Sequence, residues 1–382
     1  MISFITYFLT FYIFFSIVIL PQNNSSNDLY FYVGTYTNGD SKGIYLYKMD
    51  SVTGRITNVA ITDKVKNPSF MAINKTGNNL YCVNEISDYE GTNSGSISAY
   101  RISPITKELE LINIKSSQGA DPCYVTVDEA NKHILVSNYS GGSIALLTLD
   151  KSGALNRTID VAEHKSFGSN KNIINKAHAH SIVLDNQNKF AYAADLGIDK
   201  IITYMINHEK NELDVINETQ IDSGAGPRHL AIHQNGKYAY VINEKHNSII
   251  SFSIEEADGS LQKIESYSTL PDNFNEKSYC ADIHIHPNGK FLYGSNRGHN
   301  SIVIYEIDEE TGRLNRLGFE STQGNWPRNF AIDPTGNFIL VANQKSNNIA
   351  VLKISDKTGL LNYTGISESV PSPACLLFYE KE

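Results

Sequence analysis

Charged and imidazole side chains interrupt a regular pattern of small and neutral residues at a few positions of this chain. The candidates for a catalytic role are His180, Glu244, Arg228 and Arg297, and the candidates for substrate binding are Arg328, His178, His229, Asp282 and Glu85. Arginine guanidinium groups bind carboxylate or phosphate through paired hydrogen bonds. They can also stabilise the oxyanion that forms when water attacks a carbonyl, while a Glu or His takes the proton from that water. The set therefore suits an anionic substrate with an ester or a similar carbonyl.

Other kinds of site have little support in the sequence. There is no G-x-S-x-G motif for a serine nucleophile, and the candidate set offers too few converging carboxylates for Ca²⁺ or Mg²⁺. No paired Cys and His spacing marks a zinc site, so we expect no metal. The four cysteines are expected to be buried free thiols, with a disulfide left open if the protein is exported; they are Cys82, Cys123, Cys280 and Cys375.

An internal repeat positions the candidates. In four copies a proline and an asparagine are 16 positions apart; these pairs are Pro68 and Asn84, Pro122 and Asn138, Pro227 and Asn243, and Pro327 and Asn343. Two further copies end in Asp195 and Asn296 without the proline. A period of about 50 residues, with β-rich runs joined by turns such as Asn235-Gly236, indicates one supersecondary unit per copy. The recurring Asn and Asp residues are expected to be structural.

The two ends of the chain complete the repeat. Residues 30–35 match a second strand that has no first strand before it, and residues 373–378 match a first strand that has no second strand after it. A turn that follows the third strand occurs seven times. Pairing the ends would close a ring and hide the sheet edges of an open array. The sequence thus predicts an all-β, seven-bladed β-propeller over residues 28–380, closed by pairing N- and C-terminal strands in one blade.

Propeller geometry predicts that the candidates share one face. The first strand of a blade lines the channel and the second runs antiparallel beside it, so the start of the first lies near the end of the second. The first-strand series reads Ser69, Cys123, His180, Arg228, Ala281, Arg328 and Ala374; the second-strand series reads Thr35, Glu85, Tyr139, Leu196, Glu244, Arg297 and Gln344. Together they predict a charged rim at a channel mouth. Structural salt bridges remain an alternative for Glu244, Arg228 and Arg328, and structural roles are favoured for His284 and His286.

The net charge and the hydropathy of the chain limit the binding partners and the cellular location that we expect. With 32 basic and 41 acidic residues the formal net charge is −9, which argues against nucleic acid as a partner. Residues 1–21 are predicted to be a signal peptide or a membrane anchor, because the run up to Leu20 is apolar. The protein would then be exported (periplasmic, secreted or anchored), and cytoplasmic if this segment is no functional signal. Membrane contact is expected only through this segment if it is uncleaved, and we expect a monomer.

Six motifs in this order resemble the seven-bladed β-propeller lactonase family, which includes propeller-type 6-phosphogluconolactonases and carboxymuconate cyclases. They are Val33-Gly34-Thr35-Tyr36-Thr37, His178-Ala179-His180-Ser181, Gly226-Pro227-Arg228-His229-Leu230, Cys280-Ala281-Asp282-Ile283-His284, the run from Ser295 to Ile302, and Pro327-Arg328-Asn329-Phe330. The resemblance covers about residues 30–378.

The resemblance implies ring-opening hydrolysis of a sugar lactone, typically 6-phosphoglucono-1,5-lactone, with no metal or organic cofactor. By similarity with the cyclase branch, His180, Arg228, Glu244 and Arg297 map onto the site. Glu244 or His180 would be the general base, and the two arginines would hold the anion and the developing oxyanion.

Two departures from the family leave alternatives open. Residues 167–172 lack the expected Pro- and Arg/Gln-containing loop, and the apolar N-terminus is unexpected. An exported relative could act on an unphosphorylated aldonolactone. The alternatives outside lactone hydrolysis are a propeller module that binds a glycan or a protein, and a cyclase that forms lactones from a muconate.

Overall fold

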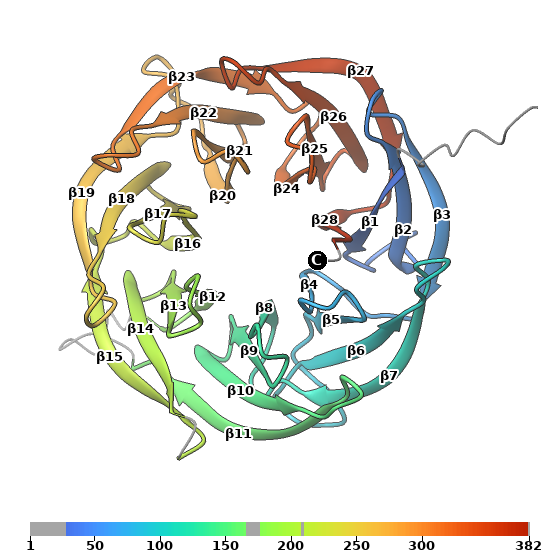
Figure 1. Ribbon diagram of the computed structural model, residues 1–382. Helices are drawn as coiled ribbons and strands as arrows, with labels where there is room; N and C mark the ends of the chain where they lie inside the picture. The colour runs from blue at the N-terminus through green and yellow to red at the C-terminus, as the bar shows by residue number, and fades with distance from the viewer. Residues whose placement is uncertain (1–27, 166–175, 208–209, 381–382) are drawn as a thin grey trace, which may run out of the picture.

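The computed structural model describes residues 28–165, 176–207 and 210–380, which form a ring of seven four-stranded antiparallel sheets (Figure 1). In each sheet the first strand lies nearest the axis and the fourth lies on the outside. All of the regular elements in these residues are strands. The predicted seven-bladed β-propeller is confirmed.

The strands follow one another blade by blade around the ring, and we number the blades from the one that holds the N-terminal strand. Their bounds are β28 (Pro373–Phe378), β1 (Asp28–Thr35), β2 (Gly43–Asp50) and β3 (Ile56–Asp63) in blade 1; β4 (Met71–Ile73), β5 (Asn79–Asn84), β6 (Ser96–Ile102) and β7 (Leu109–Ser116) in blade 2; β8 (Pro122–Val127), β9 (His133–Asn138), β10 (Ser143–Leu149) and β11 (Leu155–Glu163) in blade 3; β12 (Ala179–Leu184), β13 (Phe190–Asp195), β14 (Lys200–Asn207) and β15 (Glu212–Gln220) in blade 4; β16 (Pro227–Ile232), β17 (Tyr238–Asn243), β18 (Ser248–Ile254) and β19 (Leu261–Ser268) in blade 5; β20 (Tyr279–Ile285), β21 (Phe291–Arg297), β22 (Ser301–Ile307) and β23 (Leu314–Ser321) in blade 6; β24 (Pro327–Ile332), β25 (Phe338–Asn343), β26 (Asn348–Ile354) and β27 (Leu361–Ser369) in blade 7.

The two ends of the chain meet in blade 1. The N-terminal strand β1 pairs with β2 on one side and with the C-terminal β28 on the other, where Phe31 lies opposite Phe378. The Phe31 ring is fully buried and lies 5.4 Å from the ring of Tyr47 and 5.3 Å from that of Phe378. This seam gives both edges of β1 a partner and closes the ring, as the repeat predicted.

Apolar side chains from neighbouring blades fill the space between the sheets. The second strand is buried along its length in blades 2 to 7, so it is mostly apolar rather than alternating. Its tyrosines also bond to the next blade: the hydroxyl of Tyr81 donates to the Gly153 carbonyl at 3.0 Å, and that of Tyr293 to the Gly359 carbonyl at 2.9 Å. Both acceptors belong to the recurrent turn after the third strand. These two tyrosines thus join blade 2 to blade 3 and blade 6 to blade 7.

The recurrent Asn residues tie strand ends together, as expected. The Asn138 amide donates to the Ser117 carbonyl at 3.0 Å, and the Asn296 amide to the Thr269 carbonyl at 2.7 Å. All four cysteines are buried free thiols.

A β-bulge lies at the start of the inner strand in six blades. In blade 5, Pro227 lies opposite Asn243 and His229 opposite Ile242, so Arg228 is the extra residue. Four other blades have one extra residue in the same way: His180, Cys123, Arg328 and Ala374. In blade 6 two residues, Ala281 and Asp282, lie opposite the single residue Ser295. A bulge re-aims side chains locally. Six of the seven members of the first-strand series that the sequence singled out, all except Ser69, are therefore bulge positions.

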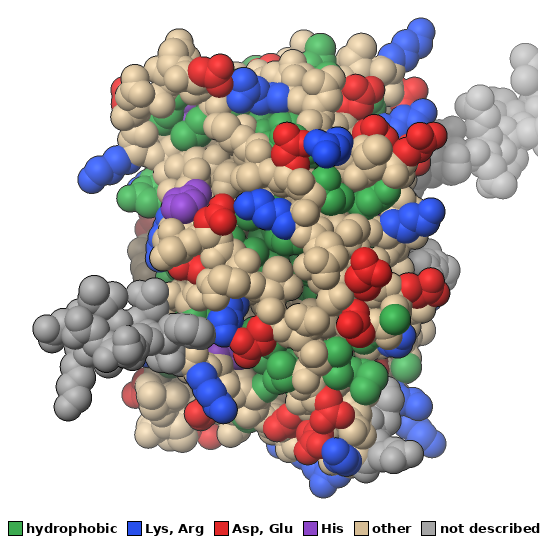
Figure 2. Space-filling model, turned by 90° about the vertical axis from the view of Figure 1, so that its left-hand side faces the viewer, with side chains coloured by type: hydrophobic (Ala, Val, Ile, Leu, Met, Phe, Trp, Pro, Cys, Tyr) green, Lys and Arg blue, Asp and Glu red, His purple; other side chains and the backbone are tan. Residues whose placement is uncertain are grey.

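The outer surface carries both signs of charge. On the flank seen in Figure 2, acidic and basic side chains are interspersed with apolar ones. Among the described residues, no helix is long and apolar enough to span a membrane. The signal peptide or anchor predicted at residues 1–21 lies outside the described residues, as does the 167–172 segment, so both stay predictions.

Replacing Phe31 by Ala should weaken the seam between β1 and β28. Its ring is fully buried, and truncating a buried Phe to Ala costs about 3–5 kcal/mol in the free energy of unfolding because a cavity remains. Urea unfolding followed by circular dichroism measures this loss. Val59→Ala in the same blade, where the side chain is 43% exposed, is the control and should change stability by less than about 0.5 kcal/mol. Equal effects of the two substitutions would contradict the role of the seam.

Candidate active site

One carboxylate bridges two arginines at the start of the inner strands of blades 5 and 6. Glu244 follows β17, Arg228 starts β16 and Arg297 ends β21. The Glu244 Oε2 atom lies 2.7 Å from Arg297 Nη2 and 3.2 Å from Arg228 Nε. Both of these contacts are made by Oε2, so Oε1 is the oxygen available to orient a water molecule. The side chain of Glu244 is 21% exposed, whereas those of Arg228 and Arg297 are 2% and 6% exposed.

The two arginines keep Glu244 ionised. Burial alone would raise the pKa of Glu244, but the positive charges of Arg297 and Arg228 lower it below its usual value. Arg297 is further fixed by donating to the Cys280 carbonyl at 2.7 Å. The carboxylate is thus held in one orientation, charged at neutral pH and open to solvent on one oxygen.

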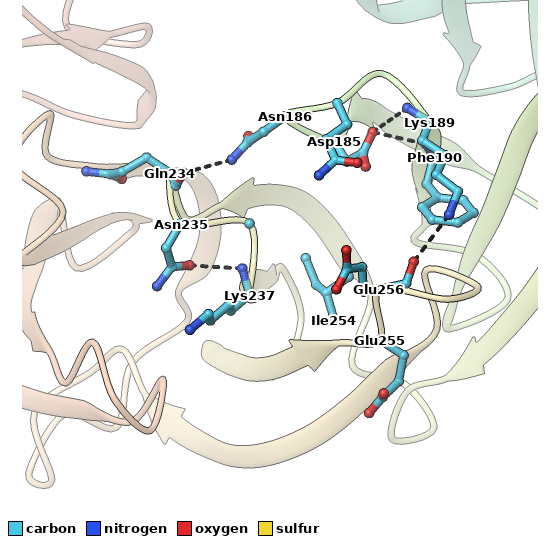
Figure 3. Close-up of a pocket in the computed structure, with 12 residues that line it drawn as sticks. Asp185, Asn186, Lys189, Phe190, Gln234, Asn235, Lys237, Ile254, Glu255 and Glu256 are labelled. Carbon is cyan, nitrogen blue, oxygen red and sulfur yellow. Dashed lines mark hydrogen bonds between the residues drawn. The ribbon is translucent and has the colours of Figure 1, made fainter.

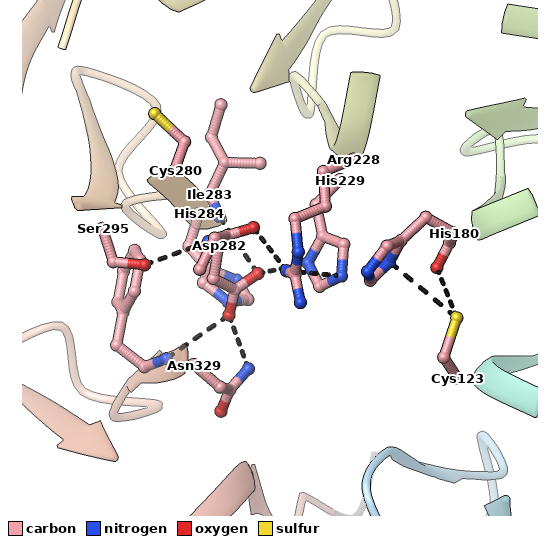
Figure 4. Close-up of polar contacts among 12 residues, drawn as sticks. Cys123, His180, Arg228, His229, Cys280, Asp282, Ile283, His284, Ser295 and Asn329 are labelled. Carbon is pink, nitrogen blue, oxygen red and sulfur yellow. Dashed lines mark hydrogen bonds and ion pairs between the residues drawn. The ribbon is translucent and has the colours of Figure 1, made fainter. Parts of the chain in front are cut away.

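Arg228 rests on a buried hydrogen-bonded chain (Figure 4). Its Nη1 lies 3.1 Å from His229 Nε2 and also donates to the Ala281 carbonyl. Because the guanidinium can only donate, His229 Nε2 accepts and His229 Nδ1 carries the hydrogen that is donated to Asp282 at 2.7 Å. Burial and the nearby Arg228 lower the pKa of His229 to about 4, so this imidazole is neutral at pH 7.

Asp282 is the anchor of this chain. Its oxygens accept from the rings of His229 and His284, from the Asn329 amide and from the backbone of Ile283. Burial would raise its pKa, but the two histidines and these hydrogen bonds hold it far below its usual value. Since both oxygens are occupied, the structure places Asp282 as a buried support for His229 and Arg228. Its expected contact with substrate is untested.

His180 lies across from this chain, near the axis. Its ring is 5.3 Å from the His229 ring and 5.4 Å from the Tyr139 ring, and its Nδ1 lies 3.8 Å from the Cys123 sulfur. Burial, followed by the positive charge of Arg228, holds the pKa of His180 well below its usual value. Burial also raises the pKa of the Cys123 thiol. Both groups are therefore neutral at pH 7, and Cys123 is no thiolate nucleophile.

Arg328 and Glu85 form a second, looser pair on the same rim. Arg328 Nη2 lies 3.7 Å from Glu85 Oε2, and the guanidinium carbon lies 5.0 Å from the centroid of the Tyr36 ring. The Tyr36 hydroxyl donates to Glu85 at 2.7 Å. Arg328 and Glu85 are 17% and 20% exposed. With its long ion pair, Arg328 is the arginine of the three whose donors are least engaged.

Three further histidines named in the sequence analysis lie in different parts of the ring: His178, His284 and His286. His178 is half-buried at the rim, stacks on Tyr139 at 4.5 Å and bonds to the Tyr139 carbonyl. His284 lines a cavity of about 370 Å³ along the axis together with His229 and Asp282; its side chain is 41% exposed. Burial would lower its pKa, but pairing with Asp282 raises the pKa above its usual value. His286 bonds to the Gly336 carbonyl at 2.9 Å, which fits the favoured structural role.

Three residues that form cation–π contacts at the rim were not among the predicted site residues: Tyr36, Lys345 and Trp326. Tyr36 and Lys345 each lie one position after a member of the second-strand series, and Trp326 lies just before a proline of the repeat. Reading one residue further at each strand end would have found them. All three contact rim groups.

The described residues offer no group of three His, Cys, Asp or Glu side chains that could hold a metal ion. A hollow of about 540 Å³ lies on the opposite face, where Gln234 and Lys237 line it at the hairpin between β16 and β17 (Figure 3). Its lining carries both signs of charge, from Lys189 and from Asp185, Glu255 and Glu256, and includes none of the predicted site residues. The rim therefore remains the candidate for chemistry.

Replacing Asp282 by Asn should lower both the stability and the pKa of His284. The neutral amide removes the charge that favours the imidazolium, so the His284 pKa should move down in an NMR titration of the ring protons. Removing one member of this buried network should cost roughly 3 kcal/mol in the free energy of unfolding. The exposed Asp272→Asn serves as control and should leave both quantities unchanged. An unaltered His284 titration would refute the Asp282 anchor.

Comparisons with known proteins match the sequence and the fold of this chain. The family model described as "Lactonase, 7-bladed beta-propeller" matches residues 30–378. A 6-phosphogluconolactonase of Bacillus subtilis is 34% identical over 304 residues, which is 79% of this chain and 84% of the relative. A putative 6-phosphogluconolactonase of Bacteroides fragilis superposes with a TM-score of 0.84 at 34% identity, covering 94% of this chain and 100% of the other.

A periplasmic gluconolactonase of Pseudomonas aeruginosa superposes with a TM-score of 0.87 at 29% identity, covering 93% of this chain and 100% of the other. The family match spans every blade, including the seam of β1 and β28. The chain therefore belongs to the seven-bladed β-propeller lactonase family.

Proposed function

We propose that the protein hydrolyses the ester bond of a sugar lactone and releases the aldonic acid. The observation that carries the proposal is Glu244, whose Oε2 is held by two arginines while Oε1 stays free for water. A carboxylate fixed in this way can orient a water molecule and take its proton. The relatives named 6-phosphogluconolactonase or gluconolactonase support the same chemistry.

The reaction would run on the rim residues alone. Glu244 takes a proton from water as the water oxygen attacks the lactone carbonyl carbon. The negative charge that develops on the carbonyl oxygen is stabilised by Arg297, which Glu244 and the Cys280 carbonyl hold in place, and by Arg328, whose donors are less engaged. When the bond between the carbonyl carbon and the ring oxygen breaks, the ring oxygen takes the proton back. The products are a free hydroxyl and a carboxyl group, so atoms and charge balance.

Two expected roles change in this mechanism. Arg228 is 2% exposed and bonds to the Ala281 carbonyl and to His229, so it holds Glu244 rather than the anion. His180 is neutral at pH 7 and has a lowered pKa, which makes its conjugate acid unfavourable. We therefore assign the base to Glu244 and give His180 a contact with the substrate. The substrate would be an aldonolactone, with or without a phosphate.

Glu244→Gln should lower kcat about 100-fold or more, because the amide cannot accept the proton from water. Acid release from glucono-1,5-lactone and from its 6-phosphate, corrected for spontaneous opening, measures the rate. Glu255→Gln on the opposite face is the matched control and should keep the wild-type rate. A Glu244→Gln enzyme within threefold of the wild type would remove Glu244 as the base. An inactive wild type on every lactone tried would instead favour a binding module.

The pH profile of kcat/KM should show no acid limb near pH 6–7. Glu244 must be ionised to act as the base, and its arginine partners lower its pKa below the ordinary value of 4.5. Activity should therefore persist as the pH falls and decline only below about 4.5. A limb near pH 6.5 would point to a histidine with an ordinary pKa and would contradict the assignment.

A further inference from the structure

The residue before the proline of the repeat has a left-handed backbone in every blade that keeps the proline. The φ angles are 41° at Asn67, 53° at Asp121, 66° at Gly226, 67° at Trp326 and 43° at Ser372. Asn, Asp and Gly adopt positive φ at little cost, whereas a bulky side chain there is an outlier. Four blades therefore carry a small residue at this position, and blade 7 carries the largest side chain of all.

Strain of this kind persists where the surroundings enforce it, and it is concentrated at functional sites. The Trp326 backbone is held at both polar atoms: its N–H donates to Asn300 Oδ1 at 2.9 Å, and its carbonyl accepts from the Gln344 N–H at 3.1 Å. A smaller residue would satisfy the same bonds without strain. The blade therefore needs the left-handed turn, but it does not need an indole there.

The indole lies beside the proposed catalytic groups. Its ring is 5.3 Å from the guanidinium carbon of Arg297, which in turn contacts Glu244. Tyr279, from the equivalent position in blade 6, has its ring 6.2 Å away. Trp326 is half-buried, and the exposed Lys345 places its ammonium 3.2 Å from the ring centroid. The ring is thus a partly open aromatic surface at the edge of the mouth.

We propose that Trp326 is a specificity-determining wall of the site, against which the apolar face of the lactone ring packs next to Arg297. The inference rests on the proposed lactone hydrolysis and adds a residue that contacts the sugar ring. An aromatic face suits the C–H face of a sugar ring, because it offers a large apolar surface at a rim that is otherwise charged. The exposed, flexible Lys345 side chain moves aside when the ring binds.

Trp326 is the chain's single tryptophan, so its fluorescence reports on this wall alone. The probe is D-glucono-1,5-lactam, which keeps the closed ring and resists opening. Titrating it into the full-length protein should give a saturable change in emission. A flat titration would overturn the proposal.

Three variants test the wall by kinetics on glucono-1,5-lactone. Trp326→Asn keeps a residue that accepts positive φ but removes the ring, and kcat/KM should fall roughly tenfold, mainly through KM. Trp326→Phe keeps an aromatic face and should stay within about threefold of the wild type. The Tm of both should lie within about 3 °C of the wild type, because relief of strain offsets lost packing. Unchanged kcat/KM in Trp326→Asn would overturn the proposal.

The Lys345→Ala variant distinguishes two roles for this region, a wall for the sugar ring and a subsite for an anion. It uncovers the ring, so opening of the unphosphorylated lactone should be unchanged or faster. If Lys345→Ala slows only the 6-phosphate, and Trp326→Asn does the same, the pair binds phosphate and the wall is refuted. Should the wild type open no lactone, the proposed function fails, and the lactam titration still decides whether Trp326 contacts a sugar ring.

Discussion

The hydrogen-bonded seam between β1 and β28 holds seven blades in one ring, and the position of every rim residue depends on it. Glu85 and Glu244 directly follow second strands and Arg297 ends one, whereas His180, Arg228 and Arg328 come from first strands of different blades. They meet only because the ring brings all inner strands to one axis. The seam also leads into the site, since the Leu376 N–H of β28 donates to Asn329, whose amide donates to Asp282.

Like charges at one channel mouth set the second constraint. Burial, followed by the positive charges of Arg297 and Arg328, lowers the pKa of Arg228 to about 10, which still leaves it charged at neutral pH. Burial and the charge of Arg328 also lower the pKa of Arg297. Glu244 offsets two of these charges and Glu85 the third. Burial, followed by the charge of Arg228 and more weakly that of Arg328, lowers the pKa of His180 and keeps it neutral. The mouth is therefore a preorganised positive environment, which stabilises a developing oxyanion without rearranging water.

The sequence predicted the ring, the seam and the face on which the charges lie, because strand period and turn spacing fix which strand ends share a face. The burial of individual side chains and their contacts could not be predicted from the sequence. Arg228 and His229 are consecutive, so a regular strand would point them to opposite sides; the bulge lets them contact each other at 3.1 Å. Burial of Asp282 and the pairing of Cys123 with His180 depend on packing between blades, which no spacing along the chain reports.

A repeat also shows where one copy carries a residue type that the local backbone conformation disfavours. The copies of one blade measure what a position needs for folding. Five blades keep the proline, and in four of them the left-handed residue before it is small: Asn67, Asp121, Gly226 and Ser372. Backbone strain of this kind costs of order 1–3 kcal/mol. Blade 7 can carry that cost at Trp326 because Asn300 and Gln344 fix the backbone there and six other blades share the ring. A position that is costly for the fold and adjacent to Arg297 is explained by binding rather than by stability.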